Sequence, residues 1–210
     1  MNTFCSFAAE LNRVLSVIIQ SDALHAKWIN TLSYLENCGA RKIAACEHPT
    51  QVKEEMLKHA AEEFRHAHHL KKQILKILPS SFKDYSLPYL LGGTHSLHYL
   101  QALDLQTSRY LSQTVKLSPQ ATKEAAYLLV TYAIELRAEE LYPIYDAILR
   151  KTSSKVVVKS ILLEEKEHLN EMRHHLASLP LGFLHAEKVC AFESTLCKNW
   201  LLSVEQSLLV

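Results

Sequence analysis

The chain has 210 residues, of which 23 are Lys or Arg and 22 are Asp or Glu, so its formal net charge is +1. Such near-neutrality gives no electrostatic reason to expect nucleic acid as a partner. No stretch approaches the roughly 20 apolar residues of a membrane span. The start of the chain lacks the basic segment of a signal peptide. We therefore expect a cytoplasmic protein without a membrane span.

Five cysteines are spread over the chain, and no two of them form a Cys-x-x-Cys pair. Reduced thiols in a cytosol are the simplest interpretation of an odd number without paired spacing. A zinc ribbon or a rubredoxin-type iron centre is therefore excluded as a reading of these residues. Any metal site must be built from other side chains.

Only four Gly and six Pro interrupt the chain, while Leu, Ala, Glu and Lys are abundant. This composition favours long helices over strands. An all-α fold is therefore expected. In chain order, apolar periodicity and breaker residues predict helices over about 3–19, 22–46, 51–77, 95–115, 119–150, 153–178 and 183–208.

Several polar residues stand where these helices should begin. Thr50 and Thr94 are the expected caps of the third and fourth helices, and Ser118-Pro119 combines a cap with proline in the first turn. Residues 152–154 are expected to start the sixth helix. The short loops near 47–50 and 151–154 indicate two antiparallel hairpins, which the long segment 79–118 would join.

Two Glu-x-x-His pairs provide the first chemical signal, Glu63 with His66 and Glu165 with His168. In a helix, residues three apart share a face, so each pair can reach one metal region. Each pair also interrupts an otherwise apolar line along its helix. Because charged groups in an apolar line are costly unless they are paired or bound to a cation, the two pairs predict a buried metal site.

Other histidines and acids near these pairs are interpreted as surface residues. A third Glu-x-x-His copy, Glu171 with His174, falls off the apolar line of its helix. His68 and His69 flank the first pair, and His59 lies one turn before it. A surface position is the expectation for all three, because the motif by itself is common in a chain rich in Glu and His.

Each remaining helix of the two hairpins supplies one further acid to the expected site. Glu36 is the only acid on the apolar line of 22–46, and Glu135 is our choice in 119–150. Glu139, one turn later, is either an acid that orients the ligands or a salt-bridge partner. Tyr132 and Tyr142 flank Glu135 at helical spacing and either donate hydrogen bonds or electrons there or simply pack in the core.

The complete set of expected metal ligands holds four carboxylates and two imidazoles. Sites rich in oxygen with one imidazole per metal suit iron or manganese better than zinc. Two iron ions are therefore the expected cofactor, with manganese as the alternative. The six predicted ligands are Glu36, Glu63, His66, Glu135, Glu165 and His168.

In this ligand order the chain resembles the ferritin-like di-iron carboxylate proteins. Segments 134–138 and 142–145 look particularly like the aldehyde-deformylating oxygenases, and 135–139 also resembles the di-iron tRNA hydroxylases. The resemblance implies one domain over 1–210, with a ferritin-like four-helix bundle, a long crossover and extra flanking helices. The core bundle would span 22–178, with the helices 3–19 and 183–208 packed on it.

The resemblance implies a di-iron oxidase or oxygenase that activates dioxygen to oxidise a small organic substrate, with electrons from an external donor. One alternative is a ferroxidase or a rubrerythrin-like peroxidase that consumes peroxide. Another is a helical interaction protein with a structural or decayed metal site. The apolar stripe of the last helix is expected to pack on the bundle or on the mate in a homodimer.

Overall fold

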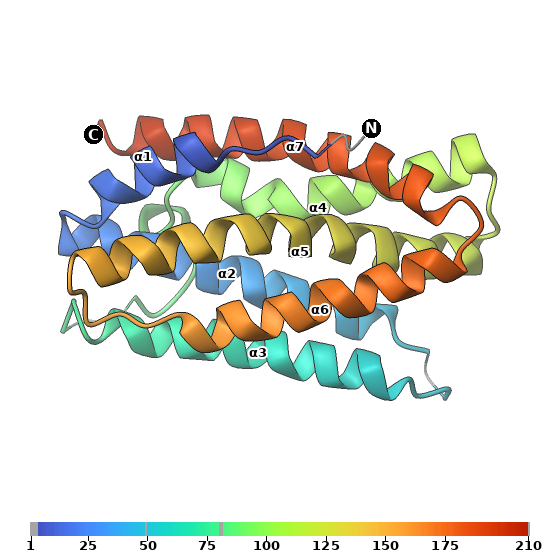
Figure 1. Ribbon diagram of the computed structural model, residues 1–210, viewed down its shortest axis with the longest axis horizontal. Coiled ribbons are helices and arrows are strands. Elements are labelled where there is room, and N and C mark those ends of the chain that lie inside the picture. Colours follow the sequence, from blue (N-terminus) through green and yellow to red (C-terminus); the bar gives the residue numbers. More distant parts are fainter. Residues whose placement is uncertain (1–3, 49, 80–81, 210) are drawn as a thin grey trace.

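The computed structural model describes residues 4–48, 50–79 and 82–209, and within them the chain is all-helical without a strand (Figure 1). The expectation of an all-α fold is thereby confirmed. No helix in the described part of the chain combines the length and apolarity needed to cross a membrane. The α-helices are α1 (Ala8–Ile18), α2 (Asp22–Cys46), α3 (Glu54–Ile74), α4 (Gly93–Arg109), α5 (Pro119–Lys151), α6 (Lys159–Ser178) and α7 (Gly182–Ser207), with a 3₁₀ turn at Leu87–Tyr89 and a π-helical turn at Tyr110–Val115.

The helices lie mostly along the long axis of the molecule (Figure 1). Helix α2 packs along α3, and α5 packs along α6, as the short loops between them predict. The segment 75–118 leads from one hairpin to the other and contains α4. Helix α4 packs against α7, while α1 lies against α5 and α7. The two hairpins therefore carry the predicted site residues, and α1, α4 and α7 cover one side.

Helix α5 begins where the sequence predicts, because Ser118 caps it and its side chain accepts a hydrogen bond from the Ala121 amide at 3.3 Å. The prediction for α3 is wrong: this helix begins at Glu54 after Lys53, and Thr50 lies outside it. The first helix is also shorter than predicted, beginning at Ala8; residues 1–3 lie outside the described residues.

Helix α4 follows Gly92 and not the predicted cap Thr94. Gly92 has a φ of 77°, and a Cβ at this position would meet the Ser96 Oγ at 2.8 Å and Val204 of α7 at 3.0 Å. A left-handed conformation under such crowding requires glycine. The close packing of α7 on this turn thus sets where α4 begins.

Helix α6 starts at Lys159, six residues later than predicted. The segment before it is not helical and is held to α3: the Val157 amide donates to the Gln73 Oε1 at 3.0 Å, and the Val157 carbonyl accepts from His69 at 2.8 Å. Val156 and Val158 on either side are buried. Tertiary packing therefore overrides the local cap signal of residues 152–154.

An aromatic group joins three helices beside the metal-site region. Trp28 of α2 stacks on Trp200 of α7 with ring centroids 5.6 Å apart, and Tyr145 of α5 meets Trp28 edge-on at 6.4 Å. All three side chains are fully buried. Aromatic pairs contribute about 0.5–1.5 kcal/mol beyond the burial of their area. The apolar stripe of the last helix thus packs inward here.

His25 makes the stability of this core depend on pH. Its ring is buried and hydrogen-bonded to the Tyr145 hydroxyl at 2.6 Å, and burial lowers the pKa of His25 to about 4 although Asp22 acts in the opposite direction. Between pH 6.5 and 4 the unfolded chain takes up a proton that the native state refuses, so acidification costs stability. The difference corresponds to about 3 kcal/mol.

We therefore expect the free energy of unfolding of wild type to fall by about 3 kcal/mol more than that of His25→Gln between pH 7 and pH 4. The amide retains a hydrogen-bond partner for Tyr145 and does not titrate. Urea unfolding of both proteins at several pH values measures the difference. All other titrating groups are common to the two chains, so equal pH slopes would contradict a neutral buried imidazole at His25.

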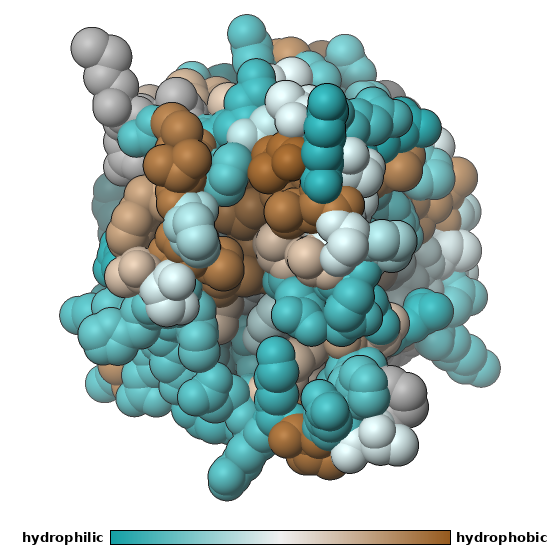
Figure 2. Space-filling view, turned by 90° about the vertical axis from the view of Figure 1, so that its right-hand side faces the viewer, coloured by the Kyte–Doolittle hydropathy of each residue, from teal (hydrophilic) through white to brown (hydrophobic). Residues whose placement is uncertain are grey.

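The end of the molecule at which α2 ends and α5 begins carries a mixed surface (Figure 2). Hydrophilic side chains cover most of it, and apolar side chains gather in the upper half of this view. Leu181 and Leu184 at the start of α7 are among the exposed large apolar residues of the protein. Exposed apolar side chains are normal on the surface of a folded domain.

Candidate metal centre

Four helices direct acidic and histidine side chains to one interior place. All six side chains predicted as ligands meet there, and each comes from the helix that the sequence assigns to it. Five are almost fully buried, and the side chain of Glu36 is 13% exposed. They are Glu36 of α2, Glu63 and His66 of α3, Glu135 of α5, and Glu165 and His168 of α6.

One group of donors consists of Glu36, Glu63, His66 and Glu165. Their candidate ligand atoms all lie within 4.8 Å of one another. The His66 Nδ1 lies 3.1 Å from a Glu165 oxygen, 3.7 Å from Glu63 and 3.9 Å from Glu36. Three carboxylates from three helices thus converge on one imidazole nitrogen.

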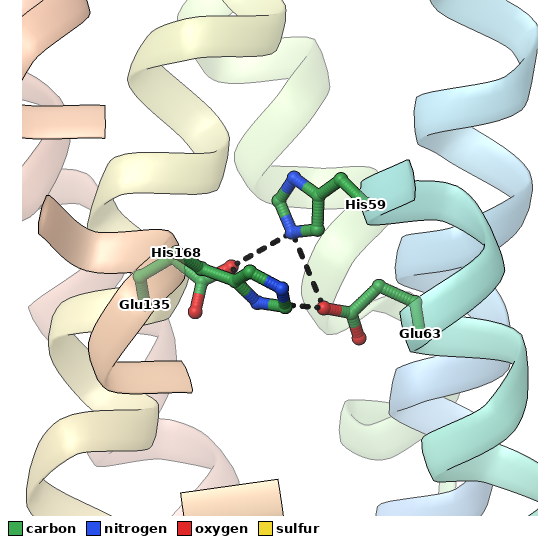
Figure 3. Close-up of side chains that lie close together, drawn as sticks. All are labelled: His59, Glu63, Glu135 and His168. Carbon is green, nitrogen blue, oxygen red and sulfur yellow. Dashed lines mark hydrogen bonds and ion pairs between the residues drawn. The ribbon is translucent and has the colours of Figure 1, made fainter. Parts of the chain in front are cut away.

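A second group consists of His59, Glu63, Glu135 and His168, again within 4.8 Å (Figure 3). The His59 Nε2 lies 3.2 Å from the Glu63 Oε1 and 3.2 Å from the Glu135 Oε1. The His168 Nδ1 lies 3.5 Å from the same Glu63 oxygen. Because Glu63 belongs to both groups, its carboxylate is shared by two adjacent candidate sites for a cation.

Three buried atoms in the two groups have no hydrogen-bond partner: the Nδ1 atoms of His66 and His168, and the Oε2 of Glu135. A buried polar atom without a partner costs about 1–3 kcal/mol. Three of them aimed at one place are costly together, and metal ions would satisfy all three. The residues present therefore fit a pair of divalent cations.

The outer nitrogens of the two histidines are held by acids from the opposite helix. The Nε2 of His168 on α6 is hydrogen-bonded to Glu62 of α3 at 2.9 Å, and the Nε2 of His66 on α3 to Glu164 of α6 at 2.6 Å. These bonds place a proton on Nε2 and direct Nδ1 inward, toward the carboxylates of the site. Histidines that ligate metals are typically oriented by such a carboxylate.

Burial and like charge act on two of the carboxylates. Burial, with the charges of Glu63 and Glu165, raises the pKa of Glu36 well above its usual value. The pKa of Glu135 is raised for the same reasons, with Glu165 as its first charged neighbour. Without metal, the charged form of both side chains is therefore disfavoured. A bound cation would act in the opposite direction, because it stabilises the charged carboxylates.

The other two carboxylates are paired with imidazolium. Against burial, the contacts of Glu63 with His59 and His66 keep its pKa well below the usual range, and contacts with Glu135, His168 and His66 lower the pKa of Glu165 to about 2. In return, and again against burial, the carboxylates raise the pKa of His66 to about 12 and that of His168 to about 9. Protons thus balance the charge of the metal-free cluster.

Oxygen and nitrogen donors of this kind can hold a metal ion, and two divalent cations would neutralise the four carboxylates. Carboxylates with imidazoles suit iron and manganese, whereas structural zinc sites rely on sulfur and nitrogen. The two groups differ, because one contains two histidines and the other contains one. They therefore offer their metals unequal numbers of nitrogen donors.

His59 corrects the sequence interpretation, which places it on the surface. Its side chain is only 2% exposed and lies inside the second group. The spacing contains the signal: His59 is four residues before Glu63 and seven before His66, so all three share one face of α3. The expectation for His68 is met, because its side chain is exposed.

Of the three further residues predicted to act at the site, only Tyr142 lies there, where its hydroxyl donates to a Glu36 oxygen. Glu139 does not: its side chain is 41% exposed and lies 3.7 Å from Arg173, so the salt-bridge alternative describes it. Tyr132 packs in a separate apolar cluster with Cys190 and does not line the cavity beside the carboxylates.

A cavity of about 100 Å³ lies beside the carboxylates, between α2, α4, α5 and α7. Its wall is mainly apolar, with Leu32, Ile134 and Trp200 among the lining residues, and the carboxylates of Glu36 and Glu135 form part of it. A small apolar space that opens onto a candidate metal pair is the usual form of a substrate pocket.

The chain was compared with protein-family models, with curated proteins and with solved structures, and none of the three comparisons found a match. The functional assignment therefore rests on the side chains themselves. From these side chains we conclude that α2, α3, α5 and α6 build a buried site of four carboxylates and three imidazoles that can hold metal ions.

Proposed function

We propose that the protein is a non-haem di-iron oxidoreductase of ferritin-like architecture that uses dioxygen to oxidise a small organic substrate. One observation carries the proposal: two donor groups share Glu63, and the unpartnered Nδ1 atoms of His66 and His168 face into them. A purely structural core gains nothing from such a collection of buried acids, because each one costs stability.

The order of the donors along the chain supports the ferritin-like architecture. Two hairpins joined by one long crossover, with one Glu on each of two helices and Glu-x-x-His on each of the other two, are the pattern of ferritin-like di-metal proteins. Here α2 and α5 each supply one Glu, α3 and α6 each supply Glu-x-x-His, and 75–118 is the crossover.

When bound, a pair of ferrous ions supplies electrons and coordination positions for dioxygen. The chain contributes orientation and exclusion of water. Glu62 and Glu164 fix the two imidazoles from outside, and the Tyr142 hydroxyl restrains Glu36 on the side of the cavity. The burial of the donors keeps bulk water from the metals.

The mainly apolar cavity favours an organic substrate over iron storage. Hydrated ferrous ions gain nothing from a wall of Leu32, Ile134 and Trp200, whereas an apolar molecule does. The carboxylates of Glu36 and Glu135 border the same space, so a molecule held there would lie next to the metals.

Anaerobic titration with ferrous iron, followed by air and ascorbate as electron donor, tests the proposal. We expect about two iron ions per chain and dioxygen consumption that continues at constant iron content. Iron content that grows far beyond two per chain would indicate ferroxidase and storage activity. Failure of the chain to bind ferrous iron under anaerobic conditions would contradict the proposed function.

A further inference from the structure

A second hollow lies next to the inner cavity, and its chemistry is different. This outer groove has a volume of about 540 Å³ and runs between α2, α4 and the first turns of α5. Three cationic side chains line it, Arg41, Lys42 and Lys123, against a single carboxylate, Asp104. The charge of the groove is therefore positive, although the protein as a whole is almost neutral.

Two of these cations are available to a ligand. Lys42 is paired with Asp104 across α2 and α4. Arg41 and Lys123 are exposed and have no carboxylate at ion-pair distance within the described part of the chain. The first turn of α5, with Pro119 in the groove wall, adds the positive end of a helix 33 residues long. All three contributions favour an anion.

The groove and the inner cavity are neighbours that share part of their lining. Lys42 and Leu100 line both of them. A molecule that spans both hollows would lie beside the Lys42–Asp104 pair, with its inner part against mainly apolar side chains. Its anionic end would remain among the cations, because transfer of a charge to a mainly apolar space is costly.

We propose that the two hollows form one binding site for a small organic monoanion with a compact apolar body. The anionic group lies between Arg41 and Lys123, and the body fills the inner cavity beside the carboxylates. This inference rests on the proposed function in one respect: that function is what makes the bound molecule a substrate. The binding itself follows from the shape and charge of the hollows.

The inner cavity sets the size and kind of the apolar body. A cavity of about 100 Å³ is smaller than the 150 Å³ engineered cavity that accepts benzene, so a single ring is the largest apolar body it suits. The rings of Tyr99, Tyr142 and Trp200 form part of its wall and offer edge and face contacts to another ring. A phenyl group joined to a carboxylate by a short chain meets both requirements.

Calorimetric titration of the full chain, metal-loaded and after chelation, tests the site with matched probes. Phenylacetate, 3-phenylpropanoate and 4-phenylbutanoate carry ring and charge; 3-phenylpropanamide lacks the charge, and acetate lacks the ring. We expect at least one aryl acid to bind about 10-fold or more tightly than both the amide and acetate. Aryl acids that all fail to bind below about 10 mM, or an amide that binds equally well, would overturn the proposal.

Variants then assign the two halves of the site. Arg41→Gln with Lys123→Gln should remove the preference for acid over amide, while Lys76→Gln with Lys155→Gln, an equal loss of exposed cations outside the groove, should retain it. Ala138→Leu should fill the inner cavity and abolish binding of acid and amide alike. Unchanged affinities in either test variant contradict the assignment.

The outcomes separate this inference from the proposed function. If the chain holds iron and binds an aryl acid but consumes no dioxygen, the anion site is supported and the oxidoreductase function is contradicted. If the chain consumes dioxygen but binds no aryl acid, the function is supported and the anion site is contradicted. The chelated protein provides the binding result without iron, so failure of the metal centre cannot be mistaken for failure of the anion site.

Discussion

The double variant Glu36→Gln, Glu135→Gln is expected to be more stable than wild type without metal and to lose most of the stabilisation that metal ions give. Burial raises the pKa of both acids, so the native state binds their protons more tightly than the unfolded state does. A raised pKa costs stability above the ordinary value near 4.5, and glutamine removes this cost. Removing a strained functional group gains on the order of 1–2 kcal/mol.

The same change should weaken metal binding severely. Each donor group loses one carboxylate, since Glu36 belongs to one and Glu135 to the other. Loss of a ligand should exceed the ~100-fold loss of affinity that removal of an outer partner causes. Ferrous iron that binds only the native state would raise its melting temperature by mass action, and in the double variant this shift should nearly vanish.

Calorimetric melting with and without ferrous iron measures both effects, and metal analysis gives the stoichiometry. Glu139→Gln is the matched control, because Glu139 lies one turn from Glu135 on the same helix but is exposed. The control should match wild type in both states. Unchanged iron content in the double variant would show that these two carboxylates are not ligands.

The part of the candidate site that could be predicted from the sequence is the part governed by helical periodicity. Glu63 and Glu165 each stand three residues before a histidine on an apolar line, and this local geometry survives whatever the helix packs against. The short loops near 47–50 and 151–154 predicted the two helical hairpins, and the length of a loop is also a local property of the sequence. The structure brings the helices carrying these pairs together.

The acids that hold the histidines depend on the distance between α3 and α6, which no local pattern encodes. Glu62 and Glu164 directly precede Glu63 and Glu165 in the chain. An interpretation that considers each helix alone therefore places them on the face toward solvent. Each nevertheless reaches a histidine on the other helix. The repeated Glu-Glu-x-x-His was the available signal. His59 was missed differently, because a surface position is the default for a lone imidazole.

Glu139 shows where periodicity fails. Glu139 lies one turn after Glu135 on α5, yet Glu139 is exposed and Glu135 is buried. Helix α5 has 33 residues and different neighbours along its length, so its buried face turns with them. The same dependence on partners moved the start of α6, because Gln73 and His69 of α3 hold the preceding segment through hydrogen bonds to Val157.

Glu193→Ala is expected to destabilise the metal-free protein by about 3 kcal/mol, the lower end of the cost of breaking a buried ion pair, because Arg137 keeps its second carboxylate partner, Glu140. Glu193 is fully buried on α7 and accepts two hydrogen bonds at 2.8 Å from the guanidinium of Arg137 on α5. Tyr99 of α4 donates to the same carboxylate. The pair thus joins three helices next to the cavity wall that Arg137 and Tyr99 help to form.

Urea unfolding at neutral pH measures this cost, and Glu205→Ala is the matched control. Glu205 also lies on α7 and pairs with Arg13 of α1, but the Arg13 side chain is 61% exposed. Exposed pairs contribute about 0–1 kcal/mol, because water solvates the partner that remains. Both substitutions remove one carboxylate from the same helix, so burial of the abandoned guanidinium is the main difference. A cost for Glu193→Ala no larger than that for Glu205→Ala would mean that water reaches Arg137, and with it the wall of the cavity.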